Sequence, residues 1–289
     1  MQIKKALIVH NKPLYELHIL EEKDPYYLKL YRGKHPTTRI WKKVYEQHRD
    51  TLEGVERTLK LLGIETDILF RKKVKTLKKY DLVITVGGDG TFLETSHLVQ
   101  KNQILLGVNA APFDSTGALC RGRLDNFLTT LVALIEGKLK PRLVPRLKVK
   151  LNKKVLPYPV LNEVLFANQS SAGTSRYLIT KGKLKEEHKS SGVWMSTSTG
   201  STAAIRSAGG TPMPLGQKGM QFAVRELFPE KDKKFKIIKG ILPAKSKLVF
   251  YSKMRQGALF IDGSHLMFPV GYGEKIEVSP DGPPLLAIL

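Results

Sequence analysis

The 289-residue sequence is poor in cysteine and has no long apolar run. Its one cysteine, Cys120, has no partner for an intrachain disulfide and excludes a zinc site built from several cysteines, so we expect a reducing, cytoplasmic setting. No apolar run reaches the roughly 20 residues that span a bilayer. The first ten residues, MQIKKALIVH, lead directly into a strand-like segment. We therefore expect a soluble protein with no cleaved targeting peptide and no membrane partner.

Several common catalytic motifs are also missing from the sequence. It contains no GxxxxGK[ST] P-loop, no HExxH, no GxSxG and no CxxC. These absences exclude a Walker-type nucleotide site, a zincin protease, a nucleophile-elbow esterase and a dithiol redox centre. Nor does any spacing of histidines and carboxylates predict a dedicated metal cage.

Acidic residues are scarce relative to basic ones, with 26 Asp and Glu against 48 Lys and Arg, for a net charge of +22. Such a surface attracts polyanions, so a nucleic acid is one candidate partner. The basic runs have no interleaved aromatic residues, and no zinc finger, homeodomain or RNA-recognition motif is present. We favour a solvated basic surface around an enzyme of anionic substrates, with nucleic acid as an unlikely partner.

The pattern of apolar residues changes near Lys140. Before this point, strand-like runs alternate with helical spacing, which predicts a Rossmann-like α/β domain with a mostly parallel sheet over residues 1–140. The expected strands cover 3–9, 65–70, 82–86 and 104–108, and the expected helices cover 38–62, a segment starting near Thr91, and a segment capped by Asp125 that ends at Ile135.

After Lys140 the residues alternate with a period of two. Leu147, Val149 and Leu151 alternate with Arg146, Lys148 and Lys150, and a turn at 152–154 predicts a hairpin whose second arm runs towards Phe166. Short strands are expected at 176–180, 193–196, 248–252, 258–261, 266–268 and 275–278. This pattern predicts an antiparallel, β-rich, sandwich-type domain over residues 141–289.

The most informative stretch is Tyr80 to Val99, in which an apolar strand breaks at Gly87-Gly88-Asp89-Gly90 and resumes as a helix. Three glycines in four positions let the backbone approach a ligand closely, and the helix start adds free N–H groups and a positive dipole end. The turn therefore predicts a phosphate-sized anion site. Its acid, Asp89, is either a helix N-cap or a group that receives a hydroxyl proton during phosphoryl transfer.

Three later segments accompany this GGDGT motif: Asn162-Glu163 within LNEVLFA, the block SGVWMSTSTGSTAAIRSAGG from Ser191 to Gly210, and the FIDG turn that contains Asp262. The four motifs resemble, in order and spacing, those of the NAD kinases, which share GGDGT with diacylglycerol kinases and 6-phosphofructokinases. The segment GVNAAPFDSTGALC, from Gly107 to Cys120, is similar to the mitochondrial-type branch of NAD kinases.

The resemblance implies an enzyme that transfers the γ-phosphoryl group of ATP to the 2′-hydroxyl of the adenosine ribose of NAD, giving NADP. It further implies a divalent cation, most simply Mg²⁺, a homodimer, and an active site between the two domains. By the same resemblance Asp89 acts on the 2′-hydroxyl as a base or positioner, Asn162 binds an adenine edge, and Glu163 binds ribose hydroxyls. The other nucleotide-binding positions it implies are Gly87, Gly88, Gly90, Thr91, Phe92, Asn109, Ser191, Thr197, Thr199, Gly200, Ser201, Thr202, Ala203, Ser207 and Asp262.

Two positions depart from the pattern of the family, and several alternatives stay open. Ala204 stands where the family has an aromatic residue, and Ser191 where it has an aspartate. A lipid kinase with the same turn, and a non-catalytic nucleotide- or RNA-binding protein, are the alternative functions. The sequence does not distinguish NAD from NADH as acceptor, or ATP from polyphosphate as donor.

Overall fold

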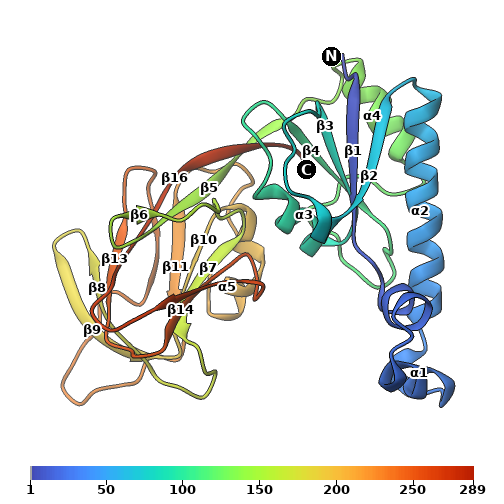
Figure 1. Cartoon of the computed structure of the whole chain (residues 1–289). Coiled ribbons are helices and arrows are strands. Elements are labelled where there is room, and N and C mark those ends of the chain that lie inside the picture. The colour runs from blue at the N-terminus through green and yellow to red at the C-terminus, as the bar shows by residue number, and fades with distance from the viewer. Residues whose placement is uncertain (1) are drawn as a thin grey trace. The chain divides into compact units, whose positions relative to one another are not determined.

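The computed structural model describes residues 2–289, which form two compact units (Figure 1). Unit 1 comprises the residues up to Arg142 together with Leu286–Leu289, and unit 2 comprises Leu143–Leu285. The sequence analysis assigned the whole chain after residue 140 to the second domain. The last four residues belong instead to unit 1, because the end of the final strand pairs with a strand of that unit.

Unit 1 is built on a parallel sheet in the order β2-β1-β3-β4-β16, in which every neighbouring pair is parallel. All six residues of β3 and of β4 are buried, as expected for strands covered on both faces. The strands are β1 (Lys5–His10), β2 (Glu65–Phe70), β3 (Leu82–Gly87), β4 (Ile104–Asn109) and the last residues of β16 (Lys275–Ile288). The predicted parallel α/β unit is confirmed.

Helices cover both faces of this sheet. Figure 1 shows α2 (Trp41–Leu61) and α4 (Phe127–Ile135) on one face and α3 (Asp89–Ser96) on the other. Helix α3 starts at Asp89, two residues before the expected position. The prediction that Asp125 caps α4 is wrong, because Asn126 occupies the N-cap position and its side chain accepts a hydrogen bond from the N–H of Arg123.

A helical segment between β1 and α2 was not predicted. It contains the π-helical turn Tyr15–Glu21, α1 (Pro25–Arg32) and a 3-10 turn at Pro36–Thr38, and a further 3-10 turn, Arg71–Lys73, follows β2. The π-helical turn and α1 bury no residue. Aromatic contacts attach the segment instead, since the Tyr15 ring lies 5.1 Å from that of Tyr31 and 5.5 Å from that of Tyr45.

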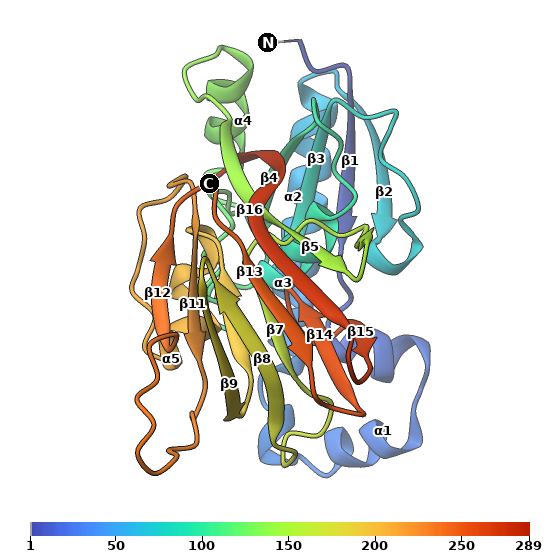
Figure 2. The ribbon, with the colours of Figure 1, turned by 90° about the vertical axis from the view of Figure 1, so that its left-hand side faces the viewer.

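Unit 2 is a sandwich of two antiparallel sheets. One sheet has the order β12-β11-β10-β7-β14-β15, and the other contains the start of β16 with β13, β8 and β9 (Figure 2), together with β5 and β6. Side chains from both sheets, among them Phe166 and Phe250, form one buried core. The predicted sandwich is confirmed. Its strands are β5 (Arg142–Leu151), β6 (Lys154–Val155), β7 (Glu163–Asn168), β8 (Ser175–Lys181), β9 (Leu184–Ser190), β10 (Val193–Ser196), β11 (Met220–Val224), β12 (Lys239–Leu242), β13 (Leu248–Ser252), β14 (Gly257–Ile261) and β15 (Leu266–Val270).

The predicted hairpin in unit 2 is only partly correct. Strand β6 has two residues and pairs with the end of β5, whereas Glu163–Asn168 forms β7 in the other sheet, between β10 and β14. Strands β9, β11 and β12 were not predicted. The sequence of β9, LKEEHKS, is almost wholly polar, so apolar alternation gives no signal there.

We expect the tail of β16 to contribute to the stability of unit 1. Ile288 is 1% exposed in the core of that unit, so Ile288→Ala should lower its free energy of unfolding by about 2–4 kcal/mol. Urea unfolding in a Trp194→Phe background, followed by the fluorescence of the remaining Trp41, would measure unit 1. Leu61→Ala is the control, because Leu61 is 78% exposed; equal effects of the two substitutions would contradict the prediction.

Candidate functional site

The GGDGT turn lies at the carboxyl edge of the unit 1 sheet, where Gly87 ends β3 beside Asn109 at the end of β4. Gly87 has a φ of 159°, and a Cβ there would lie 2.6 Å from Oγ1 of Thr91 and 2.7 Å from Oδ1 of Asn11. A Cβ on Gly88 would lie 2.7 Å from Oγ of Ser115. The first two glycines are therefore required by close packing around the turn.

The third glycine faces open space. Gly90 is exposed, and a Cβ built on it would have no atom within 4 Å. It lies in the first turn of α3, where the helix dipole favours an anion, although the N–H groups of Thr91 and Phe92 already donate to the carbonyl of Gly88. The backbone at Gly90 is thus exposed to solvent, and the phosphate site expected at this turn stays a prediction.

Asp89 does not act as the helix N-cap, because Gly88 occupies that position. Its carboxylate instead accepts hydrogen bonds from the N–H of Ala118, at 3.0 Å, and from the N–H of Leu119, at 2.8 Å. The side chain therefore holds the loop that follows β4. Each carboxylate oxygen has a second lone pair, so Asp89 can still accept a hydrogen bond from a substrate hydroxyl.

Asn109 and Phe92 make contacts within the protein. The Asn109 amide donates to the carbonyl of Ser115, at 2.9 Å, and its oxygen accepts from the N–H of Ala111, at 3.1 Å. Phe92 is completely buried, and Thr91 is only 3% exposed. Asn109 therefore holds the loop after β4 through hydrogen bonds, and Phe92 and Thr91 pack in the interior beneath the turn.

Two basic side chains near the turn are paired with glutamates, and the thiol of Cys120 has a raised pKa. Lys12 is paired with Glu21, and Nη1 of Arg71 lies 3.2 Å from Oε2 of Glu94. Burial, with a smaller effect from the charge of Asp89, raises the pKa of the Cys120 thiol to about 12. Cys120 is therefore protonated at neutral pH and is unsuited to act as a nucleophile.

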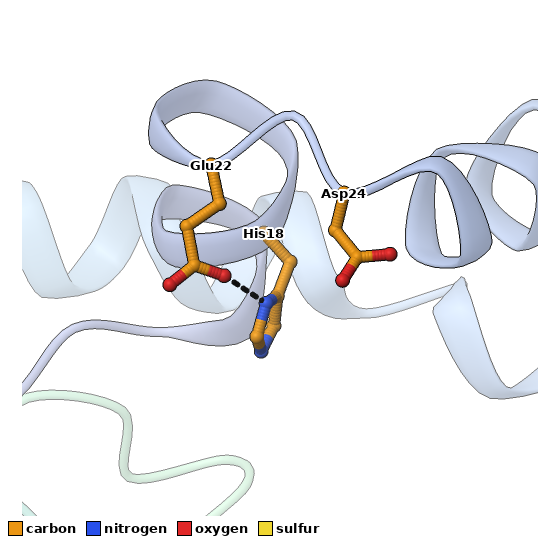
Figure 3. Close-up of side chains that lie close together, drawn as sticks. All are labelled: His18, Glu22 and Asp24. Carbon is orange, nitrogen blue, oxygen red and sulfur yellow. Dashed lines mark hydrogen bonds and ion pairs between the residues drawn. The ribbon is translucent and has the colours of Figure 1, made fainter.

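Among residues 2–289, one group of three metal-ligand side chains lies close together, and none of the three is among the predicted site residues. Figure 3 shows His18, Glu22 and Asp24 in the segment before α2. Nδ1 of His18 lies 2.8 Å from a carboxylate oxygen of Glu22, and Asp24 accepts from the N–H groups of Tyr26 and Tyr27 as the cap of α1. Existing partners thus account for this arrangement.

We expect Gly87 and Gly90 to respond differently to substitution. Gly87→Ala should lower the free energy of unfolding by about 1–3 kcal/mol, because the methyl group collides with Thr91 and Asn11 at a positive φ. Gly90→Ala should change stability by about 0.5 kcal/mol or less, but weaken the ATP binding that the sequence resemblance implies, because the methyl group projects into the open space. Thermal unfolding and calorimetric ATP titration would measure both. Unchanged ATP affinity in Gly90→Ala would place the phosphates elsewhere.

In unit 2 the start of β7 is fixed by Asp262, which follows β14. One carboxylate oxygen accepts from the N–H groups of Asn162, at 2.7 Å, and Glu163, at 3.1 Å, and the other accepts from the N–H of Leu161, at 2.8 Å. The N–H of Asp262 donates to the carbonyl of Glu163, at 3.0 Å. Asp262, in the predicted Asp-Gly turn, therefore fixes the backbone of the Asn-Glu motif through four hydrogen bonds.

The side chains beside these hydrogen bonds carry buried oxygen atoms without a hydrogen-bond partner. Ser196 stands opposite Glu163 in the pairing of β10 with β7, and the turn that follows β10 supplies two further hydroxyls. A buried polar atom without a partner costs free energy, so several in one place indicate a ligand. The five atoms are Oδ1 of Asn162, Oε2 of Glu163, Oγ of Ser196, Oγ of Ser198 and Oγ1 of Thr199.

Burial changes the protonation of the two acids. Desolvation, together with the charge of Asp262, raises the pKa of Glu163 to about 8, so its carboxyl is mostly protonated at neutral pH and can donate as well as accept. Burial also raises the pKa of Asp262, to about 6, because the three backbone N–H groups and Arg146 offset only part of the desolvation.

Other residues of the predicted STSTGST block hold its turn in place. Thr197 Oγ1 donates to the carbonyl of Leu161, at 2.5 Å, and accepts from the N–H of Gly200, at 3.2 Å. Ser201 Oγ donates to the carbonyl of Ser198, at 2.7 Å. A Cβ on Gly200 would lie 2.2 Å from the carbonyl oxygen of Asn162, so only glycine fits there.

The remaining predicted residues are more exposed. Thr202 ends a 3-10 turn (Thr199–Thr202) and is exposed, Ala203 is half-buried, and Ser207 ends the short helix α5 (Ala204–Ser207) with its hydroxyl donating to the carbonyl of Ala204. Ser191 is not next to Asn162 and Glu163. It lines a separate pocket of about 310 Å³ on the same sheet, whose walls include Trp194, Arg225 and Phe260.

Two residues of the candidate site in unit 2, Ser196 and Ser198, were not among the predicted ones. Both belong to the STSTGST block, so their hydroxyls could have been included on that ground. Arg146 lies outside this group; the alternation along β5 predicts an outward position for it, whereas its side chain is 4% exposed.

The raised pKa of Glu163 predicts a pH-dependent stability. Because the pKa lies above the 4.5 of an ordinary glutamate, the folded chain holds this proton more tightly than the unfolded chain, and stability is lost as the pH rises from about 4.5 to 8. Glu163→Gln should therefore be more stable than the wild type at pH 8, by roughly 1–3 kcal/mol, and similar at pH 4.5. Urea titrations at several pH values would measure the free energy of unfolding of both proteins. Glu226→Gln is the control, because Glu226 is exposed. A difference between Glu163→Gln and the wild type that does not change with pH would contradict the prediction.

Comparison with known proteins gives consistent matches. Residues 33–139 match the family model described as the ATP-NAD kinase N-terminal domain. The chain is 33% identical over 264 residues to a probable NADH kinase of Oryza sativa subsp. japonica, covering 84% of this chain and 81% of that protein. It is 32% identical over 277 residues to an NADH kinase of Arabidopsis thaliana, covering 84% and 83%.

Solved structures share the fold. An NAD kinase from Archaeoglobus fulgidus in complex with ATP has a TM-score of 0.70 at 17% identity and covers 99% of this chain and 93% of its own. A yeast NADH kinase complexed with NADH has a TM-score of 0.72 at 16% identity, and the match covers 100% of this chain and 84% of the yeast chain. In the described part of the chain, no helix is both long and apolar enough to cross a membrane.

Proposed function

The chain belongs to the NAD kinase family, and from this premise we propose that it transfers the γ-phosphoryl group of ATP to the 2′-hydroxyl of the adenosine ribose of NAD or NADH. The names of the two plant relatives support including NADH as an acceptor. The matches do not favour a lipid kinase or a non-catalytic binding protein.

The observation that supports nucleoside binding is the group of five unpartnered oxygens at the ends of β7 and β10. In our proposal the Asn162 amide binds an adenine edge, since it has both a donor and an acceptor. The protonated Glu163 carboxyl binds ribose hydroxyls, to which it can donate as well as accept. The Ser198 and Thr199 hydroxyls complete the contacts from the following turn.

At the GGDGT turn, we propose that the backbone at the start of α3 binds phosphate oxygens of the donor. Asp89 accepts a hydrogen bond from the 2′-hydroxyl while its other lone pairs hold Ala118 and Leu119. In a loose phosphoryl-transfer transition state the hydroxyl proton leaves late, so orientation of the attacking oxygen is the main contribution of this side chain.

Three finer assignments are also proposals. Mg²⁺, when bound, would neutralise phosphate charge, and it would arrive on the triphosphate, because the side chains around the turn offer no group of ligands for it. A homodimer is proposed from the family resemblance. A cytoplasmic location is proposed from the single cysteine.

The decisive test is formation of NADP or NADPH from NAD or NADH with ATP and Mg²⁺. We expect activity in the wild type and a loss in kcat of about 10²–10⁴-fold in Asp89→Asn, which keeps the shape of the side chain but removes its charge. Asp114→Asn, an exposed position in the same loop, is the control and should retain activity. A wild-type chain that binds both nucleotides but forms no product would overturn the proposed function.

A further inference from the structure

A pocket of about 430 Å³ beside the start of α2 has no place in the function described so far. Leu14, from the segment after β1, and Ile40, Trp41 and Val44, around the start of α2, supply its apolar walls. Leu14 is 47% exposed and Ile40 is 43% exposed, although both are large apolar side chains. A cavity of this size with apolar walls that are open to solvent is typical of a small-molecule site.

The pocket adjoins the GGDGT turn through Asn11. This residue lines the pocket, and its Oδ1 would lie 2.7 Å from a Cβ built on Gly87. The same Oδ1 is buried and has no hydrogen-bond partner. Because an unpartnered buried acceptor costs free energy, it indicates a donor that a ligand supplies. The pocket and the turn expected to bind phosphate are therefore separated by one side chain.

The helical segment that the sequence did not predict builds part of this pocket. Leu14 occupies the N-cap position of the π-helical turn, and Thr37, in the 3-10 turn before α2, is a further lining residue. The Trp41 ring lies 5.8 Å from that of Tyr27 on α1, and the Tyr27 ring stacks on His18 at 3.9 Å. Trp41 is only half-buried, so these contacts position its ring without enclosing it.

We propose that this pocket binds the adenine base of the ATP donor, which packs against Trp41, Leu14 and Ile40. A ribose hydroxyl of the same nucleotide donates to Oδ1 of Asn11. A base has a flat π-face that stacks on an aromatic side chain, whereas an inorganic phosphate chain has no such group. Asp114 borders the pocket from the loop after β4 but is exposed, and the base contacts do not involve it. The inference rests on the proposed function, because it takes the donor phosphates to bind at the turn.

The test separates the base from the phosphates by comparing ATP with inorganic triphosphate, which has no base. Ile40→Ser removes an apolar wall at the N-cap position of α2, where serine is a favoured residue. Trp41→Ala removes the aromatic ring, and Trp41→Phe keeps one. Leu20→Ser is the matched control, because Leu20 is also 43% exposed but lies in the π-helical turn outside the pocket lining. Calorimetric titration measures the Kd of both ligands, and steady-state kinetics measures the KM values.

We expect Trp41→Ala to raise the Kd and KM for ATP by about tenfold or more, as for the loss of one base–aromatic stack, and Ile40→Ser to raise them by about fivefold. Trp41→Phe should retain most of the ATP affinity. In these variants the Kd for inorganic triphosphate and the KM for NAD should stay within about twofold. Gly90→Ala should instead weaken ATP and inorganic triphosphate alike, because it acts at the phosphates.

Two results would overturn the inference. One is ATP affinity in Ile40→Ser and Trp41→Ala equal to that of Leu20→Ser; the other is a loss of affinity for inorganic triphosphate or NAD that matches the loss for ATP. Thermal unfolding of every variant records whether it is folded, and if Trp41→Ala is not, Ile40→Ser decides the question. Failure of the proposed function is seen separately, as a wild type that forms no NADP or NADPH, whether or not its ATP affinity responds to these substitutions.

Discussion

The site in unit 2 depends on a single buried carboxylate that accepts three consecutive backbone N–H groups. By taking the N–H groups of Leu161, Asn162 and Glu163, Asp262 fixes the start of β7 without using the Asn162 and Glu163 side chains. Those side chains therefore keep oxygens free for a ligand. Burial raises the pKa of Asp262, and the three backbone N–H groups, with a smaller effect from the charge of Arg146, offset part of that shift.

The two units expose different kinds of groups at their predicted binding positions. In unit 1 the side chains of Asp89 and Asn109 bind backbone groups of the loop after β4, and the open position is on the backbone, at Gly90. In unit 2 the backbone of residues 161–163 is hydrogen-bonded to Asp262, and the side chains of Asn162 and Glu163 have oxygen atoms without a hydrogen-bond partner. This division suits a dinucleotide kinase, because phosphates are well bound by backbone N–H groups and dipoles, whereas bases and riboses need side-chain donors and acceptors.

Most of the fold could be predicted from apolar periodicity. Buried runs such as Leu82–Gly87 carry a strong local signal, because every residue of the strand lies in the core. Strand β9 could not be predicted, since its polar sequence is accommodated by pairing with β8 and by two buried residues, His188 and Ser190. That Leu286–Leu289 belong to unit 1 could not be predicted either, because their pairing with β4 joins segments that are far apart in the sequence.

By itself the sequence determined the α/β and sandwich classes, the glycine-rich turn before a helix, and the motifs that identify the family, because periodicity and motif spacing are local properties. Only the tertiary structure decided that Asp89 holds a loop, that Arg146 is buried, and that Asp262 clamps a strand 100 residues earlier in the chain. The physical reason is that a polar side chain acquires its role from its hydrogen-bond partners and its burial, and distant segments supply both.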